Sequence, residues 1–252
     1  MMDHIAVINA TTILSDADVS AMMVAVQTQV SRDFTPNWGV DAHLVFVPHG
    51  TKPPIGYWWM AVLDDADAAG ALGYHDITPD GMPLGKVFAR TARTYGYSVS
   101  VTLSHETLEM LGDPDVNLLV EDARILRRFW AYEICDAVED DSLGYAINGV
   151  LVSDFVLPSY FETFRRTGPF DFMKRLAGPV PALTPNGYMA YVQNGSWGQV
   201  FGRSASSPRD DRALWRARPH DGSRRRRRMT ERDQRIRSVV EVVAPSLCAH
   251  ER

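Results

Sequence analysis

The stretch Ser104-His105-Glu106-Thr107-Leu108-Glu109-Met110-Leu111-Gly112-Asp113-Pro114-Asp115 carries most of the chemistry that this sequence displays. An α-helix turns once in about 3.6 residues, so His105 and Glu109 would share one face, with Glu106 beside them. An imidazole nitrogen and a carboxylate oxygen are both ligands that Zn²⁺ accepts. The spacing therefore predicts a helix that presents two metal ligands and a third group able to hold a water molecule.

The segment resembles the His-Glu-x-x-His motif of zincin-type metallopeptidases, in which two histidines hold zinc and the glutamate is the general base. Glu109 stands in place of the second histidine, and His-Glu-x-x-Glu variants occur in some zincin-like families. The segment is also similar to a Ser-His-Glu-x-x-Glu-Met-Leu-x-Asp-Pro stretch in uncharacterised bacterial and phage proteins. The resemblance implies a zinc-dependent peptidase in which His105 and Glu109 bind Zn²⁺ and Glu106 activates water.

An alternative needs no metal. His105, Glu106 and Glu109 could form the wet side of an amphipathic helix whose dry side is built from residues such as Leu108 and Leu111. The His-Glu-x-x-Glu pattern is weakly specific by itself. A catalytic zinc site also needs a third protein ligand, because it typically uses three side chains and one water.

Candidates for the third ligand lie further along the chain. Glu133 follows Glu109 by 24 residues, which resembles the spacing of gluzincins, and it lies in an apolar run where a carboxylate needs a partner. Asp136 is a second candidate, either as a ligand or as a group that orients His105 by accepting its other N–H. Asp115 is a weaker alternative, since Gly112 and Asp115 occupy the offsets at which metzincins place their glycine and third ligand.

Other chemistry is less well supported. The acidic residues of the stretch Trp130–Asp141 could bind Ca²⁺ through several carboxylates, or they could form a solvated turn, and Zn²⁺ is the preferred ion. His75 could approach the site, but we interpret a lone histidine beside Asp76 as a structural residue of a strand. Cys135 beside Asp136 is interpreted as a structural cysteine in a strand and not as a nucleophile.

The hydrophobic pattern predicts an α+β protein. A helix is expected from about residue 16 to residue 34, ended by Pro36. Residues 98–103 alternate like a strand, so the helix begins either near there or at Ser104, which would then be its N-cap. Gly112 and Pro114 end it in both cases. Strands are expected at residues 5–10, 42–47, 57–63, 72–76 and 84–89.

The order of these elements resembles the upper subdomain of zincins, where a twisted mixed sheet backs the metal-binding helix and its edge strand lines the cleft. The C-terminal part should contain a β-hairpin at residues 145–155, because Asn148-Gly149 is a strong signal for a two-residue turn. One more strand pair is expected between residues 187 and 201, after a loop at 178–185.

Charge divides the chain. Residues 1–202 hold 12 basic and 24 acidic side chains, whereas residues 203–252 hold 14 and 7. We interpret residues 1–202 as one globular domain and residues 203–252 as a basic extension with a flexible composition. The run Arg224–Arg228 could contact nucleic acid through its phosphates, or it could fold back on the acidic domain.

The sequence starts without the basic flank and apolar run of a secretory signal, and no stretch approaches the roughly 20 apolar residues of a membrane span. Only two cysteines, Cys135 and Cys248, are present, which does not suggest a disulfide framework. A cytoplasmic or virion-associated protein that does not contact membranes is therefore expected. A non-catalytic phage or virion protein that contacts nucleic acid through the basic extension remains the alternative to a peptidase.

Overall fold

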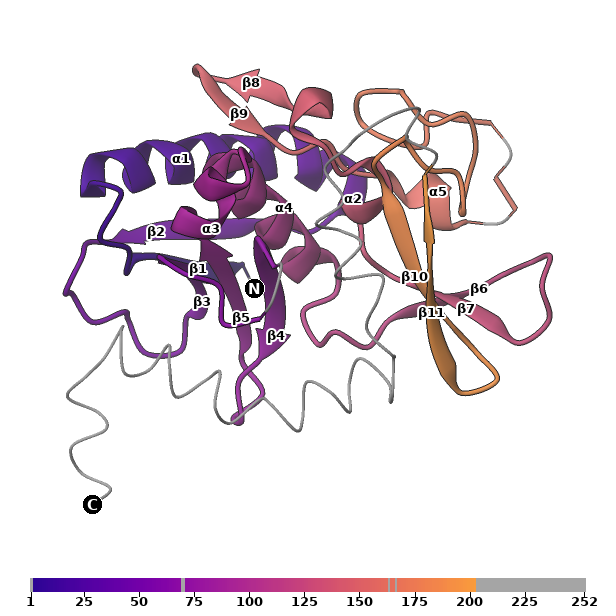
Figure 1. Cartoon of the computed structure of the whole chain (residues 1–252), viewed down its shortest axis with the longest axis horizontal. Coiled ribbons are helices and arrows are strands. Elements are labelled where there is room, and N and C mark those ends of the chain that lie inside the picture. Colours follow the sequence, from indigo (N-terminus) through magenta and orange to yellow (C-terminus); the bar gives the residue numbers. More distant parts are fainter. Residues whose placement is uncertain (1, 69–70, 163, 166, 203–252) are drawn as a thin grey trace.

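The protein has an α+β fold, as the sequence predicted (Figure 1). The structure, a computed structural model, describes residues 2–68, 71–162, 164–165 and 167–202. The expected basic extension at residues 203–252, with Arg224–Arg228, lies outside the described residues. Among the helices within the described ranges, none is long and apolar enough to cross a membrane.

A five-stranded sheet forms the N-terminal half, with the strand order β2-β1-β3-β5-β4. The first four of these strands are parallel to their neighbours, and β4 runs antiparallel to β5 at the edge. Strands β4 and β5 are joined by a turn in which the Gly81 backbone N–H donates to the Thr78 carbonyl and Gly81 adopts a φ of 83°. The strands are β1 (Asp3–Asn9), β2 (Ala42–Val47), β3 (Trp58–Leu63), β4 (Gly73–Ile77) and β5 (Pro83–Phe88).

Both faces of this sheet are buried. In β1, Ile5 and Val7 join the main hydrophobic core, whereas Ala6 and Ile8 join a smaller core on the opposite face. Side chains of a strand point alternately to its two faces, so a run that is apolar at every position indicates a strand covered on both sides. This is why residues 5–8 lack the polar alternation of a half-exposed strand.

The first helix is longer than predicted. Helix α1 (Asp16–Gln29) starts at the N-cap Ser15, whose hydroxyl accepts a hydrogen bond from the Asp18 backbone in a capping box. It continues through a π-helical turn (Val30–Phe34) into α2 (Thr35–Trp38). Pro36 did not end the helix, because it lies in the first turn of α2, where a missing N–H costs little.

Helix α4 (Val99–Gly112) contains the His-Glu-x-x-Glu segment. Ser98 is its N-cap, so Ser104 lies inside the helix and the interpretation of Ser104 as an N-cap is wrong. The Ser104 hydroxyl donates to Gln29 Oε1 at 2.6 Å and accepts from the Ser153 backbone N–H at 3.0 Å. Residues 99–111 are all buried, because α4 packs between β4 and β5 on one side and α1 and β9 on the others.

The C-terminal half contains a four-stranded sheet of order β11-β10-β7-β6 and a separate two-stranded hairpin. Both predicted hairpins are present, with Asn148-Gly149 and Asn194-Gly195 at positive φ in their turns. Strands β6 and β7 and helices α3 and α5 were not predicted. The bounds are α3 (Ala89–Thr94), β6 (Leu119–Glu121), β7 (Arg128–Ala131), 3-10 turns at Asp136–Val138 and Asp141–Leu143, β8 (Tyr145–Ile147), β9 (Val150–Val152), α5 (Pro158–Phe161), β10 (Tyr188–Gln193) and β11 (Ser196–Phe201).

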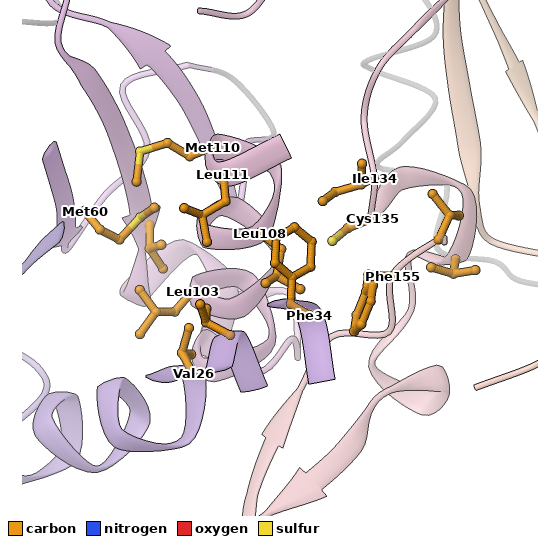
Figure 2. Packing of buried hydrophobic residues seen from close by; sticks show 14 of the residues in the cluster. Val26, Phe34, Met60, Leu103, Leu108, Met110, Leu111, Ile134, Cys135 and Phe155 are labelled. Carbon is orange, nitrogen blue, oxygen red and sulfur yellow. The ribbon is translucent and has the colours of Figure 1, made fainter. Parts of the chain in front are cut away.

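One hydrophobic core joins the two halves. Figure 2 shows the apolar side chains of α4, including Leu108, between Met60 of the five-stranded sheet and Phe155 of the C-terminal half. Ile134 and Cys135, which follow β7, belong to the same cluster. The apolar side chains of α4 therefore hold the segment after β7 against the helix, and this segment carries the remaining candidate ligands.

A buried pair of acids lies in the C-terminal half. Asp154 and Asp171 are 1% and 0% exposed. Burial raises the pKa of the Asp154 carboxyl to about 8, and its hydrogen bond to Asp171 adds to the shift. The folded protein therefore keeps a proton on Asp154 at neutral pH, whereas the unfolded chain releases it near the ordinary value of about 3.9.

The variant Asp154→Asn should be more stable than the wild type at pH 8, because its amide can donate to Asp171 without binding a proton. Between pH 4 and pH 8 the folded wild type holds one more proton than the unfolded chain, so its stability falls as the pH rises. The difference in free energy of unfolding between variant and wild type should grow over this window and level off above about pH 8. Urea unfolding at several pH values measures it, and a difference independent of pH would contradict the proton-sharing pair.

Candidate metal centre

Six metal-ligating side chains come together at one place in the core. Helix α4 supplies His105, Glu106 and Glu109, strand β4 supplies His75, and the segment after β7 supplies Glu133 and Asp136. All six residues are buried, with exposed fractions of 1–8%. Carboxylates are rarely buried unless they are paired or bind a metal. The six side chains thus form a buried polar cluster and not the solvated face of an amphipathic helix.

His105, Glu109 and Asp136 form a first group of ligands. One ligand atom of each lies within 4.8 Å of the others. The His105 Nε2 atom is 3.3 Å from Glu109 Oε1 and 3.3 Å from Asp136 Oδ1. Two ligands at about 2.0–2.1 Å from a tetrahedral zinc ion lie about 3.3 Å apart. The two distances from His105 consequently match the spacing between ligands of a tetrahedral zinc ion.

The position of Asp136 decides between its two predicted roles, as a metal ligand or as a group that orients His105. A group that orients a metal-bound histidine contacts the ring nitrogen that faces away from the metal. Asp136 and Glu109 instead approach the same nitrogen of His105. Asp136 therefore lies where a ligand would lie, and not where a partner for the other N–H would. Its second oxygen, Oδ2, is buried without a hydrogen bond from any described residue, which leaves it available to a cation.

His75, Glu106 and Glu109 form a second group with the same spacing limit of 4.8 Å. The His75 Nδ1 atom lies 3.7 Å from Glu106 Oε2 and 3.7 Å from Glu109 Oε2. His75 was interpreted from the sequence as a structural residue, so its place in this cluster was missed. The packing of β4 against α4 brings it there, and nothing local to the Tyr74-His75-Asp76 segment indicates that packing.

The remaining candidates have different positions. Glu133, the preferred third ligand from the sequence, lies beside His75, with Oε2 at 4.0 Å from Nε2. Asp115 is exposed beyond the end of α4 and belongs to neither group. Cys135 is buried just before a 3-10 turn and not in a strand. Burial raises the pKa of its thiol well above the ordinary value, which does not suit a nucleophile.

Electrostatics show how crowded the acids are. Burial raises the pKa of Glu109, with Glu133 and Glu106 adding to the shift while His105 opposes it. Burial also raises the pKa of Asp136 to about 7, with Glu109 adding and the hydrogen bond from His105 opposing. For His105, burial lowers the pKa, but attraction to Glu109 and the bond to Asp136 outweigh it and the net shift is upward. A proton on Nε2 of His105 thus occupies the place where a metal would lie.

Backbone contacts fix the cluster. The Cys135 backbone N–H donates to Glu109 Oε1 at 3.2 Å, which ties the segment after β7 to the helix. On the other side, Gly73 lets α4 approach β4 closely. A Cβ atom at Gly73 would lie 2.8 Å from Glu106 Cγ and from Thr102 Cγ2, and 2.8 Å from the Lys86 carbonyl oxygen. Residues i and i+2 of a strand share a face, so Gly73 also places His75 toward the helix.

Comparisons with known proteins do not assign the site. The chain matches no protein-family model, no curated protein and no solved structure. The chemistry of the residues themselves is the basis for any proposal about function.

The variant Gly73→Ala should be less stable than the wild type by about 1–3 kcal/mol, because the new methyl group forces the helix and strand apart. Gly178→Ala is a matched control, since a Cβ there meets nothing within 4 Å and the backbone is not in the left-handed region. Urea unfolding compares the three proteins. Equal stability of the two variants would show that α4 and β4 are not in close contact at Gly73.

Proposed function

We propose that the protein is a zinc-dependent hydrolase that cleaves peptide bonds, with Zn²⁺ held by His105, Glu109 and Asp136 and with Glu106 as general base. The observation that carries this proposal is the convergence of Glu109 and Asp136 on Nε2 of His105 at 3.3 Å. Zn²⁺ fits this donor set because one imidazole and two carboxylates are ligands that it accepts. Ca²⁺ fits less well because it prefers oxygen ligands alone.

Zinc would supply two effects at this place when bound, a lower pKa for a water molecule and polarisation of a substrate carbonyl. Glu106 is adjacent to the ligand His105 in α4, and its side chain contacts the cluster through Oε2. We assign to it the acceptance of a proton from the attacking water and the return of that proton to the leaving amine. Of the three cluster residues that α4 supplies, His105 and Glu106 have more exposed side chains, at 10% and 8%, than Glu109, at 5%.

The ligand set affects reactivity. Two carboxylates add more negative charge than two histidines would, so the metal withdraws less charge from its water. We therefore expect slower catalysis than a His-Glu-x-x-His enzyme would give, with metal binding retained.

The fold supports a zincin-like assignment as a proposal. The helix that carries His105 packs on a mixed sheet, and the strand beside it, β4, is the antiparallel edge strand. A peptide in extended conformation can add to a sheet edge through backbone hydrogen bonds. In this proposal a substrate pairs with β4 and its scissile carbonyl reaches the site.

The test uses the full chain, stripped of metal and then given one equivalent of Zn²⁺. The His105→Ala variant should bind zinc less tightly than the wild type, because one of the three ligands is gone. The Glu106→Gln variant should keep the zinc and lose about 10²–10⁴-fold in kcat/KM, because the proton acceptor is gone. Metal content is measured by mass spectrometry, and cleavage is measured on a mixed peptide library. Glu121→Gln, which changes an exposed glutamate of β6, is the matched control and should retain full activity.

Each result separates a different alternative. Absence of zinc in the wild type, or an unchanged affinity for zinc in His105→Ala, would contradict the metal site. Zinc retention with cleavage unaffected by Glu106→Gln would contradict the catalytic role and favour a structural metal. The prediction of nucleic-acid contact through Arg224–Arg228 is independent of these outcomes.

A further inference from the structure

We propose that the cluster holds a second metal subsite, formed by His75, Glu106 and Glu109, and that a metal bound there inhibits the enzyme. The inference rests on the proposed function, because Glu106 and Glu109 also belong to the proposed catalytic centre. It adds a ligand, His75, and a form of regulation by the amount of metal present.

The first argument is the geometry of Glu109. Its Oε1 atom is 3.3 Å from Nε2 of His105, and its Oε2 atom is 3.7 Å from Nδ1 of His75. The two oxygens of one carboxylate therefore face two different imidazoles. This is the arrangement of a carboxylate that bridges two metal ions, as found in two-metal sites with ions about 3.5–4 Å apart. A single metal at His105 would use only one of these oxygens.

The second argument concerns the spacing around His75. Its Nδ1 atom is 3.7 Å from both Glu106 Oε2 and Glu109 Oε2. This separation exceeds the roughly 3.3 Å between two ligands of a tetrahedral zinc ion by about 0.4 Å. Small side-chain rotations would close the difference. The three groups are consequently gathered before a metal arrives, but they lie further apart than the groups at His105.

The third argument is the position of Glu133. It faces Nε2 of His75 at 4.0 Å, whereas Glu106 and Glu109 face Nδ1. A metal-bound histidine usually has a carboxylate or carbonyl at its other ring nitrogen, which sets its tautomer and orientation. With Glu133 on one nitrogen and two carboxylates on the other, His75 has the surroundings of a metal ligand. Glu133 is then a positioning residue for His75.

The fourth argument is charge. The buried carboxylates of Glu106, Glu109, Glu133 and Asp136 carry up to four negative charges. One divalent cation does not balance all four, so protons or a second cation must balance the rest. Buried charge is costly, and a second cation would lower that cost further.

The functional consequence follows from Glu106. A carboxylate bound to a cation is a weaker proton acceptor, because the cation stabilises its charged form. Filling the second subsite would therefore weaken the general base while the first metal stays in place. The protein should be active with one equivalent of zinc and less active with two. Ligands with one nitrogen and two oxygens suit Zn²⁺ and chemically similar divalent ions.

Equilibrium dialysis of the full chain against increasing Zn²⁺ tests the proposal. The wild type should bind two equivalents, the second more weakly, and peptide cleavage should rise with the first and fall with the second. The His75→Asn variant should bind one equivalent and should not be inhibited by excess zinc. His43→Asn is the matched control, because His43 and His4 form an exposed pair on β2 and β1 that could bind zinc at the surface. It should behave like the wild type.

A measurement on the wild type alone covers the case in which His75→Asn does not fold. With Co²⁺ in place of zinc, a shared carboxylate couples the two ions, so the second equivalent should lower the electron paramagnetic resonance signal per cobalt. One equivalent of zinc at saturation would overturn the second subsite and leave the proposed function intact. No zinc at all would overturn both. Loss of the second equivalent in His43→Asn, or uncoupled cobalt ions, would place that ion elsewhere and overturn the proposal.

Discussion

The burial of four carboxylates beside two imidazoles is the constraint on which the site depends. Taking a charged carboxylate out of water costs several kcal/mol even after the protein relaxes, and attraction to a neighbouring cation must offset that cost. Here the cationic partner that Glu109 and Asp136 share is the imidazole of His105 with the proton that it carries. A metal ion offers a stronger offset than a proton does, because it carries two charges and accepts several ligands at once.

The protein keeps this costly arrangement in place by packing α4 on every side. Gly73 allows close contact with β4, and the Ser104 hydroxyl connects α4 to Gln29 of α1 and to the Ser153 backbone after β9. The apolar side chains of α4 meet Ile134, which lies between Glu133 and Cys135. These contacts are stabilised by burial of apolar surface. Hydrophobic packing thus supplies the free energy that holds the acids together, and the acids supply the chemistry.

Local patterns predicted much of the fold. The Asn148-Gly149 turn predicted its hairpin, and the apolar run at residues 5–10 predicted a buried strand. Both predictions use only residues that are close together in the sequence. The helix at His105 was expected from its spacing, but its start was ambiguous. The β-branched residues at 99–102 disfavour a helix in isolation, and tertiary packing of α4 overrides that preference. The strands around Arg128 were missed because they are short and carry little alternation.

The candidate site was predicted only in part, because only some of its residues are neighbours in the sequence. His105, Glu106 and Glu109 lie in one helix, so their proximity is a local property that the sequence shows. Whether Glu133 or Asp136 faces His105 depends on the path of the backbone after β7. That path is set by packing against α4, and the sequence around these two residues does not show it. His75 belongs to the site only through the packing of β4 against α4, a long-range contact that its neighbours do not encode.

The central claim is that His105, Glu109 and Asp136 hold a metal ion. The most direct measurement is an anomalous difference map at the zinc absorption edge, from crystals of the full chain grown with one equivalent of Zn²⁺. We predict a peak within bonding distance, about 2.0–2.2 Å, of Nε2 of His105 and of oxygens from Glu109 and Asp136. A map with the zinc peak at surface histidines, and none at this cluster, would contradict the account.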